Sequence, residues 1–358
     1  MSTKPSRQEA LGQLRAVLAQ PPPGFRRMVE AQPAVLARYQ PMFQPESLAS
    51  LTREDFLGFL LFRNNHHWDS LHRQGPQMTE DMPRLRATLQ VLLDETRPIE
   101  QRLNAMKQGA KKNSVPGLGK ATLTAILLVC HPDKYGVWNG TSRAAMEKLG
   151  LWPRFERGDS LGLRYLAVNA VLLELARELG ISLWALDGLW WQILPTEGIW
   201  KTPPEVEDEL PAEVATEAEQ MFGLERHLHD FLRDNWEKTS LGRDWDLFTE
   251  DGEQVGYEYP TPIGRIDLLA RHKRDKAWLV VELKRNQSSD DTVGQAMRYM
   301  GYVHEHVAGK DDRVDGLIIC HQGDEKIRYA LKLVPSINLM LYEVDFRLKR
   351  PRETGQEK

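Results

Sequence analysis

The chain has 358 residues, of which 41% are hydrophobic and 27% are charged, a balance typical of a globular protein with room for two hydrophobic cores. The polar start MSTKPSRQEA and the lack of any long apolar run argue against a signal peptide and a membrane span, so we expect a cytoplasmic protein. Cys130 and Cys320 lie far apart with no Cys or His at metal-ligand spacing. This spacing argues against a disulfide framework and against zinc sites.

The net charge of −4 is distributed unevenly along the chain. Residues 201–219 hold 7 acidic residues and 1 basic residue, whereas residues 1–200 hold 24 basic and 19 acidic residues. Residues 220–358 hold 22 basic and 25 acidic residues. No region has the strongly basic composition of a typical nucleic-acid-binding domain, so any DNA contact must come from local patches.

Hydrophobic periodicity divides the chain into four parts. Residues 1–195 show helical spacing, as in 84–106 and 161–180, and predict an all-helical domain. Residues 196–220 contain prolines and the acidic block and predict a linker, while residues 351–358 form a polar tail. Residues 221–350 predict an α/β domain with a mixed sheet, whose expected helices and strands in chain order are helix 224–236, strands 255–259, 264–271 and 278–285, helix 290–307, strand 315–322, a further helix and strand 337–349.

The strand LVVELKRN at residues 279–286 carries two charges among apolar residues. Side chains alternate along a strand, so Glu282 and Lys284 share one face with Val280. If the preceding strand pairs with this one as a hairpin, Asp267 can lie beside Glu282, and two converging carboxylates repel each other unless a cation lies between them. Mg²⁺ suits such a site, with the Leu283 carbonyl as a further ligand, and Lys284 could orient or deprotonate water and stabilise a pentavalent phosphate. This chemistry is phosphodiester hydrolysis.

The same residues carry a resemblance to a known family. Asp267 followed by Glu282-Leu283-Lys284 resembles the catalytic signature of the PD-(D/E)xK nucleases. Together with VGQAMRYMGYV, these motifs resemble the C-terminal domain of the NucS/EndoMS endonucleases over residues 220–348. The resemblance implies a restriction-endonuclease-like fold, Mg²⁺ or Mn²⁺ as cofactor, DNA as partner, and supporting catalytic roles for Gln295, Tyr299 and Glu225. Gln295 and Tyr299 lie one helical turn apart, so both can face one site.

A simpler explanation of these charges is an ion pair at a sheet edge, and an isolated D…ExK pattern also occurs by chance. Five matching positions in the expected order favour the nuclease. Arg285 and Arg298 would lie near a DNA path, although arginines in such places are more often only solvated. Two pairs of histidines have poor spacing for sharing a metal and are predicted to be surface residues: His227, His229, His304 and His306.

Residues 112–150 contain a second DNA-related pattern. In PGLGK, Gly117 and Gly119 permit a tight turn, and the backbone amides of the next helix together with Lys120 can hold one phosphate. This segment resembles a helix-hairpin-helix module and the DNA glycosylases that contain it. Ala121 stands where those enzymes place a lyase lysine, and Asn139 is nearest to the position of their catalytic aspartate, so phosphate binding is predicted rather than glycosylase chemistry. The alternative is a plain turn between two helices.

Two further groups in the N-terminal half are predicted to be structural. The tryptophans Trp184, Trp190, Trp191 and Trp200 are expected in core or interdomain packing rather than in base stacking. The NNHHW segment at residues 64–68 could line a base-reading pocket, but polar residues at a helix end are the preferred interpretation.

The sequence therefore predicts a divalent-metal-dependent DNA endonuclease that acts on double-stranded DNA, with the helical domain recognising a mismatch or a modified base. One such site cuts one strand, so a double-strand break requires a homodimer or two successive nicks. Roles in repair and in restriction or antiphage defence both stay open. The alternatives are a non-catalytic DNA-recognition factor and a DNA glycosylase acting through the N-terminal domain.

Overall fold

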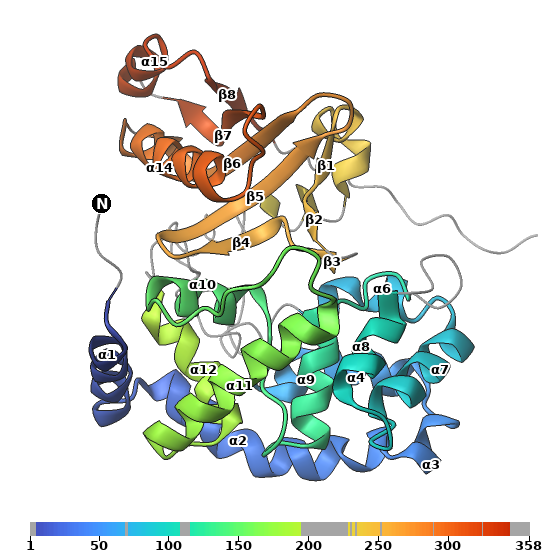
Figure 1. The fold of residues 1–358 in the computed structure, drawn as a ribbon. Helices are drawn as coiled ribbons and strands as arrows, with labels where there is room; N and C mark the ends of the chain where they lie inside the picture. Colours follow the sequence, from blue (N-terminus) through green and yellow to red (C-terminus); the bar gives the residue numbers. More distant parts are fainter. Residues whose placement is uncertain are drawn as a thin grey trace, which may run out of the picture. The chain divides into compact units, whose positions relative to one another are not determined.

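The computed structural model of the chain describes residues 5–68, 71–107, 115–194, 228–229, 231–232, 235–250, 253–288, 290–323 and 325–343 (Figure 1). The described residues fall into two compact units. The first unit comprises residues 1–214 and 247–269, and the second comprises residues 215–246 and 270–358. The predicted linker 196–220 and the tail 351–358 lie outside the described residues.

The N-terminal part of the first unit is built from helices, as its periodicity predicts. Their bounds are α1 Arg7–Ala19, α2 Pro23–Tyr39, η1 Pro41–Phe43, α3 Pro45–Leu48, α4 Arg53–Leu60, α5 Phe62–Asn65, η2 Leu71–Gln74, α6 Gly75–Met78, α7 Met82–Leu93, α8 Ile99–Lys107, α9 Lys120–Cys130, α10 Gly140–Lys148, α11 Leu161–Leu179 and α12 Leu183–Ile193.

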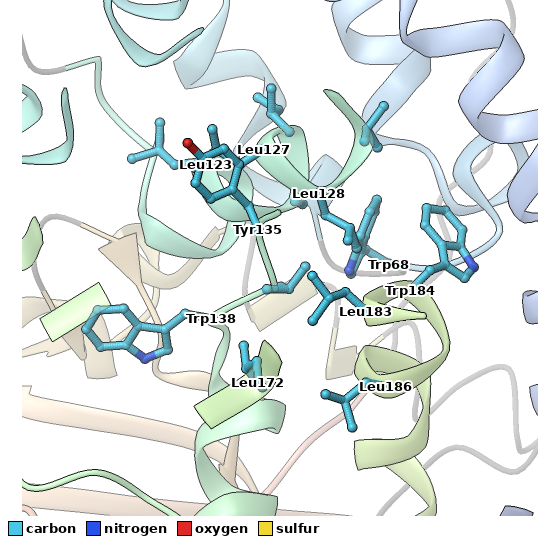
Figure 2. Packing of buried hydrophobic residues seen from close by; sticks show 14 of the residues in the cluster. Trp68, Leu123, Leu127, Leu128, Tyr135, Trp138, Leu172, Leu183, Trp184 and Leu186 are labelled. Carbon is cyan, nitrogen blue, oxygen red and sulfur yellow. The ribbon is translucent and has the colours of Figure 1, made fainter. Parts of the chain in front are cut away.

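Local signals set the ends of these helices. The Ser160 side chain caps the start of α11 by accepting a hydrogen bond from the Leu163 amide, and Gly180 ends the helix in the left-handed conformation with φ 67°. α9 is apolar on nearly every side and lies within the core of the helical unit, where Leu123, Leu127 and Leu128 pack with residues of α11 and α12 (Figure 2). No helix among the described residues is long and apolar enough to cross a membrane.

A mixed sheet follows the helices. Its strands are β1 Trp245–Leu247, β4 Tyr257–Thr261, β5 Gly264–His272, β6 Ala277–Ser288, β7 Arg313–Gly323 and β8 Ile337–Leu341, and the strand order is β1-β5-β6-β7-β8 with β4 paired to β5. β4 and β5 are antiparallel, whereas β6, β7 and β8 run parallel to one another. The boundary between the two units falls within β1 and β5.

Helix α14, Asp290–His306, is the crossover between the parallel strands β6 and β7 in the second unit. Its residues Val293 and Ala296 form a small core with Ile318 of β7 and Ile337 of β8. The short helix α15, Glu325–Leu331, connects β7 to β8, and the short helices η4 Trp236–Lys238 and η5 Leu241–Arg243 precede β1. The final strand is shorter than predicted, because β8 ends at Leu341.

The short hairpin β2–β3, Thr249–Glu250 with Glu253–Gln254, belongs to the first unit. The sequence predicts a single nuclease domain at residues 221–350. The compact units divide the chain differently, because residues 247–269 group with the helices.

Candidate active site and DNA-phosphate site

Residues 277–283 of strand β6 are buried on both faces of the strand, which explains why apolar residues do not simply alternate with polar ones there. Val280, Val281 and Leu283 are all buried, as expected for an internal strand that pairs in parallel with β7. Glu282 is 1% exposed, and the side chain of Lys284 is 30% exposed. A carboxylate buried to this degree is costly to maintain and therefore marks a candidate functional position.

Three side chains of the second unit meet at this point. Lys284 Nζ lies 3.9 Å from Glu282 Oε2, and it donates a closer hydrogen bond of 3.0 Å to Gln295 Oε1 on α14. Gln295 thereby holds the ammonium group without neutralising its charge. Tyr299 lies one turn further along α14 and is buried.

The other predicted active-site residues that the structure describes lie on β5, β6 and α14. Asp267 lies on β5 in the first unit and is partly exposed, and Leu283 is buried on β6. Arg298 is exposed on α14. The side chain of Arg285 and the whole of Glu225 lie outside the described residues. Within the described ranges, no group of three or more His, Cys, Asp and Glu side chains is arranged to hold a metal ion.

The structure describes three of the four histidines that are predicted to lie on the surface. His304 and His306 are exposed on α14, as expected. The prediction is wrong for His229, which is buried. His227 lies outside the described residues.

The PGLGK segment forms a turn that leads directly into α9. Gly117 has φ 78°, a conformation that favours glycine, and Gly119 is the N-cap residue of α9. Lys120 is 6% exposed, and its Nζ lies 2.8 Å from Glu250 Oε2 and 5.6 Å from the centre of the Trp138 ring. The predicted phosphate ligand is therefore bound to a carboxylate of the same chain.

Three residues of this cluster, Arg143, Glu250 and Glu253, are not predicted from the sequence. Arg143 of α10 donates a 3.0 Å hydrogen bond to the other oxygen of Glu250, Oε1. The Ala121 amide, at the N-terminus of α9, donates a 3.4 Å hydrogen bond to Glu253 Oε2. The available signal was the Asp-Gly pair at 251–252, which is typical of a tight hairpin turn and which separates the two glutamates.

Asn139 has a local structural role. It is the N-cap of α10, where its side chain accepts a 2.7 Å hydrogen bond from the Ser142 amide and the Ser142 hydroxyl accepts one from the Asn139 amide. This capping box accounts for the residue without glycosylase chemistry.

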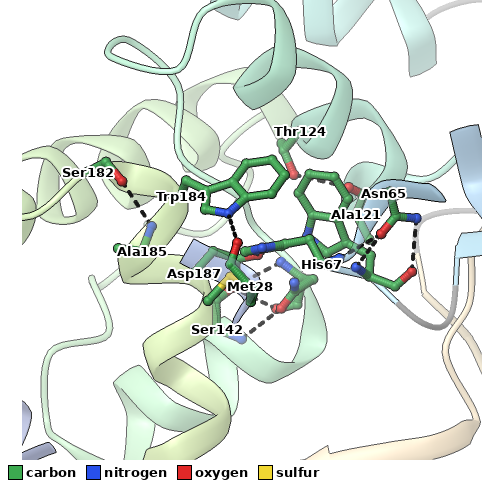
Figure 3. A network of polar contacts seen from close by, with 12 residues as sticks. Met28, Asn65, His67, Ala121, Thr124, Ser142, Ser182, Trp184, Ala185 and Asp187 are labelled. Carbon is green, nitrogen blue, oxygen red and sulfur yellow. Dashed lines mark hydrogen bonds and ion pairs between the residues drawn. The ribbon is translucent and has the colours of Figure 1, made fainter. Parts of the chain in front are cut away.

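The NNHHW segment is more deeply buried than a helix end requires. The Asn65 side chain accepts hydrogen bonds from the backbone amides of His67 and Trp68, which follow a left-handed His66 with φ 52°. This turn directs His67 and Trp68 to the buried Asp187 of α12, where His67 Nε2 lies 2.8 Å and Trp68 Nε1 lies 2.9 Å from Asp187 Oδ2. Figure 3 shows Asn65, His67 and Asp187 in this network. Trp184 and Trp190 are fully buried, which confirms their predicted place in the core, and Trp200 lies outside the described residues.

Comparison with known proteins places the Glu282 site within a recognised domain. Residues 238–357 match the family model of the endonuclease NucS C-terminal domain. Endonuclease NucS of Methanocaldococcus jannaschii is 32% identical over 77 residues, which cover 22% of this chain and 28% of that protein. The match thus spans less than a third of the length of this relative.

Two solved structures share weaker similarity with the chain. An EndoMS–dsDNA complex is 18% identical, with 39% of this chain and 50% of that chain covered and a TM-score of 0.28. A repair endonuclease from Pyrococcus abyssi is also 18% identical, with 37% and 50% covered and a TM-score of 0.26.

Proposed function

We propose that the chain is a divalent-metal-dependent DNA endonuclease whose active site contains Asp267, Glu282 and Lys284. The observation that carries this proposal is the buried Glu282 beside Lys284 and Gln295, within a segment that matches the NucS C-terminal domain. DNA repair and restriction of foreign DNA are both consistent with such an enzyme.

The donor set fits a hard cation. Carboxylate oxygens are preferred ligands of Mg²⁺ and Mn²⁺, and a divalent cation would offset the cost of burying Glu282. Asp267 lies on β5, which neighbours β6 in the strand order, and we assign it the second carboxylate. The Leu283 carbonyl is a further candidate ligand. Such a cation, when bound, lowers the pKa of water and polarises the phosphate.

Lys284 supplies positive charge at the same place. Its hydrogen bond to neutral Gln295 restricts the direction of the ammonium group, so the charge remains available for a phosphate oxygen or a nucleophilic water. Gln295 is thus a positioning residue, and we propose that Tyr299 supports the site from the same helix. Arg298 is exposed and can contact the DNA backbone.

We assign DNA recognition to the helical residues 1–195, with α9 and its preceding turn contacting a backbone phosphate. Sequence-independent phosphate contacts position a duplex and carry no base information. Selection of a mismatch or a modified base would require other residues of this region. A single active site cuts one strand, so a double-strand break would require two copies of the chain.

The decisive experiment compares the full chain with Glu282→Gln on plain, mismatched and base-modified duplexes, in Mg²⁺, Mn²⁺ or EDTA, on denaturing gels. We expect cleavage that needs the metal and falls by at least about 100-fold in the variant, because removing an outer-shell residue alone typically costs 10- to 100-fold. The matched control is Glu237→Gln, which alters an exposed glutamate of the same unit. If the wild type binds the duplex but does not cleave it in either metal, the chain is a non-catalytic DNA-recognition factor instead.

A further inference from the structure

The cluster formed by Lys120, Arg143, Glu250 and Glu253 lies entirely within the first unit. It combines the three elements of an anion site: the N-terminal amides of a helix, a lysine and an arginine. The anions that occupy it are the carboxylates of the β2–β3 hairpin.

Glu250 is bound in the way that a phosphate would be. Its Oε2 lies 2.8 Å from Lys120 Nζ and its Oε1 lies 3.0 Å from Arg143 Nη1, so each oxygen has its own cation. Burial raises the pKa of the Glu250 carboxyl, but the charges of Lys120 and Arg143 lower it further, and the net shift is downward. The carboxylate therefore stays ionised at neutral pH.

Glu253 occupies the N-terminus of α9 itself. Its Oε2 accepts the 3.4 Å hydrogen bond from the Ala121 amide, and a Cβ atom at Gly119 would lie 2.4 Å from Glu253 Cβ. Gly119 has an extended backbone with φ −94°, which any residue can adopt. Glycine is therefore required at position 119 because a side chain there would clash with Glu253, and not because of its backbone conformation.

The β2–β3 hairpin has little strand pairing of its own to resist displacement. Each strand has two residues, and isolated hairpins of this size are marginal in water. Glu250 and Glu253 are also directly paired across the two strands, and like charges in that position repel each other. The cations of the helical region offset this repulsion, so a competing anion that takes them would weaken the hairpin as well.

We propose that Glu250 and Glu253 act as an internal phosphate mimic that keeps the DNA-phosphate site at the N-terminus of α9 closed until a DNA backbone displaces them. This inference rests on the proposed DNA-endonuclease function. Arg143 is thereby a further proposed phosphate ligand. The DNA contact of the helical residues is autoinhibited, because DNA must displace two carboxylates before it can bind Lys120 and Arg143.

The test measures binding of a short fluorescein-labelled duplex to the full chain by anisotropy, in EDTA and over a range of salt concentrations. Glu250→Gln/Glu253→Gln should bind about tenfold more tightly, equivalent to about 1.4 kcal/mol, and with a steeper salt dependence. The control Glu30→Gln/Glu80→Gln removes the same charge from exposed positions of the first unit and should change affinity less. Adding Lys120→Ala to the hairpin variant should abolish the gain.

Hydrogen exchange of the wild type provides a readout that does not depend on a variant. DNA should increase exchange of the amides at residues 249–254, because the hairpin is released, whereas unchanged or slower exchange would overturn the proposal. Equal binding by wild type, hairpin variant and control would overturn autoinhibition alone. Absence of duplex binding by all of the proteins at low salt would overturn the proposed function, and the mimic with it.

Discussion

Glu95 of the first unit and Glu282 of the second unit are carboxylates with different exposure and different distances to their nearest cations. Glu95 of the first unit is 30% exposed and contacts Arg102 Nη1 at 2.7 Å, Tyr135 Oη at 3.0 Å and the Lys134 ammonium group. Glu282 of the second unit is 1% exposed, yet Lys284 lies 3.9 Å away and is closer to neutral Gln295. In the Glu95 cluster the cations contact the carboxylate directly, whereas in the Glu282 group the Lys284 ammonium hydrogen-bonds a neutral amide and lies 3.9 Å from the carboxylate.

The stabilisation that the Glu95 cluster provides should depend on pH. Burial raises the pKa of the Glu95 carboxyl, but hydrogen bonds from Lys134 and Tyr135 and the charge of Arg102 lower it below its ordinary value of 4.5. A lowered pKa means that the stabilisation is present above about pH 4.5 and is lost as the pH falls through the folded-state pKa. We therefore expect the contribution of this cluster to be constant at neutral pH and to decrease only in acid.

The largest effect should come from breaking the Glu95 cluster with Arg102→Met. Arg102 is 1% exposed and also donates a 2.7 Å hydrogen bond to the Leu92 carbonyl, so its loss leaves buried acceptors without their donor. We expect the free energy of unfolding to fall by about 3 to 5 kcal/mol, measured by urea denaturation. The control Arg97→Met removes an exposed ion pair to Asp94 and should cost at most about 1 kcal/mol. Similar losses in both variants would refute the distinction between a buried and an exposed pair.

The corresponding change in the second unit is Lys284→Met, which should affect catalysis more than stability. The ammonium group is partly exposed and lies 3.9 Å from the buried Glu282 carboxylate, beyond hydrogen-bond distance, so its removal breaks only a long ion pair, but it removes the charge proposed to stabilise the reacting phosphate. We expect the single-turnover cleavage rate to fall by about 100- to 1000-fold, with the midpoint of thermal unfolding little changed. Lys310→Met, at an exposed position of the same unit, is the control. A full cleavage rate in Lys284→Met would remove this residue from the mechanism.

Much of the fold can be predicted from the sequence because the spacing of hydrophobic residues indicates which face of a helix or strand is buried. The helices and the strands at 264–272, 277–288 and 313–323 lie where 3.6-residue spacing and apolar runs predict them. The proximity of Lys284 and Gln295 also follows, since a strand and the helix that immediately follows it must pack together in a parallel crossover.

The contacts of Lys120 and His67 could not be predicted in the same way. Lys120 and Glu250 are 130 residues apart, and His67 and Asp187 are 120 residues apart. No local propensity encodes a pairing at such separation, and a charged residue with a solvated side chain has the same local pattern as one buried in an ion pair. The sequence therefore predicts the anion site of α9 without predicting the carboxylates that occupy it.

The smallest expected effect concerns Cys130, the last residue of α9, whose thiol reports on the charge of Glu95. Burial raises the pKa of Cys130 to about 12, and the negative charge of Glu95 contributes in the same direction. Because burial is the larger cause, Glu95→Gln should increase the alkylation rate of Cys130 at pH 8 by less than about tenfold, the effect of one pKa unit. Iodoacetamide labelling with peptide mapping separates Cys130 from Cys320.

Asp133→Asn removes an exposed negative charge three residues away and should change the rate less than Glu95→Gln does. If the two variants react equally fast, proximity to Glu95 does not set the thiol pKa; if Glu95→Gln reacts far more than tenfold faster, the cluster controls access to the thiol as well as its charge.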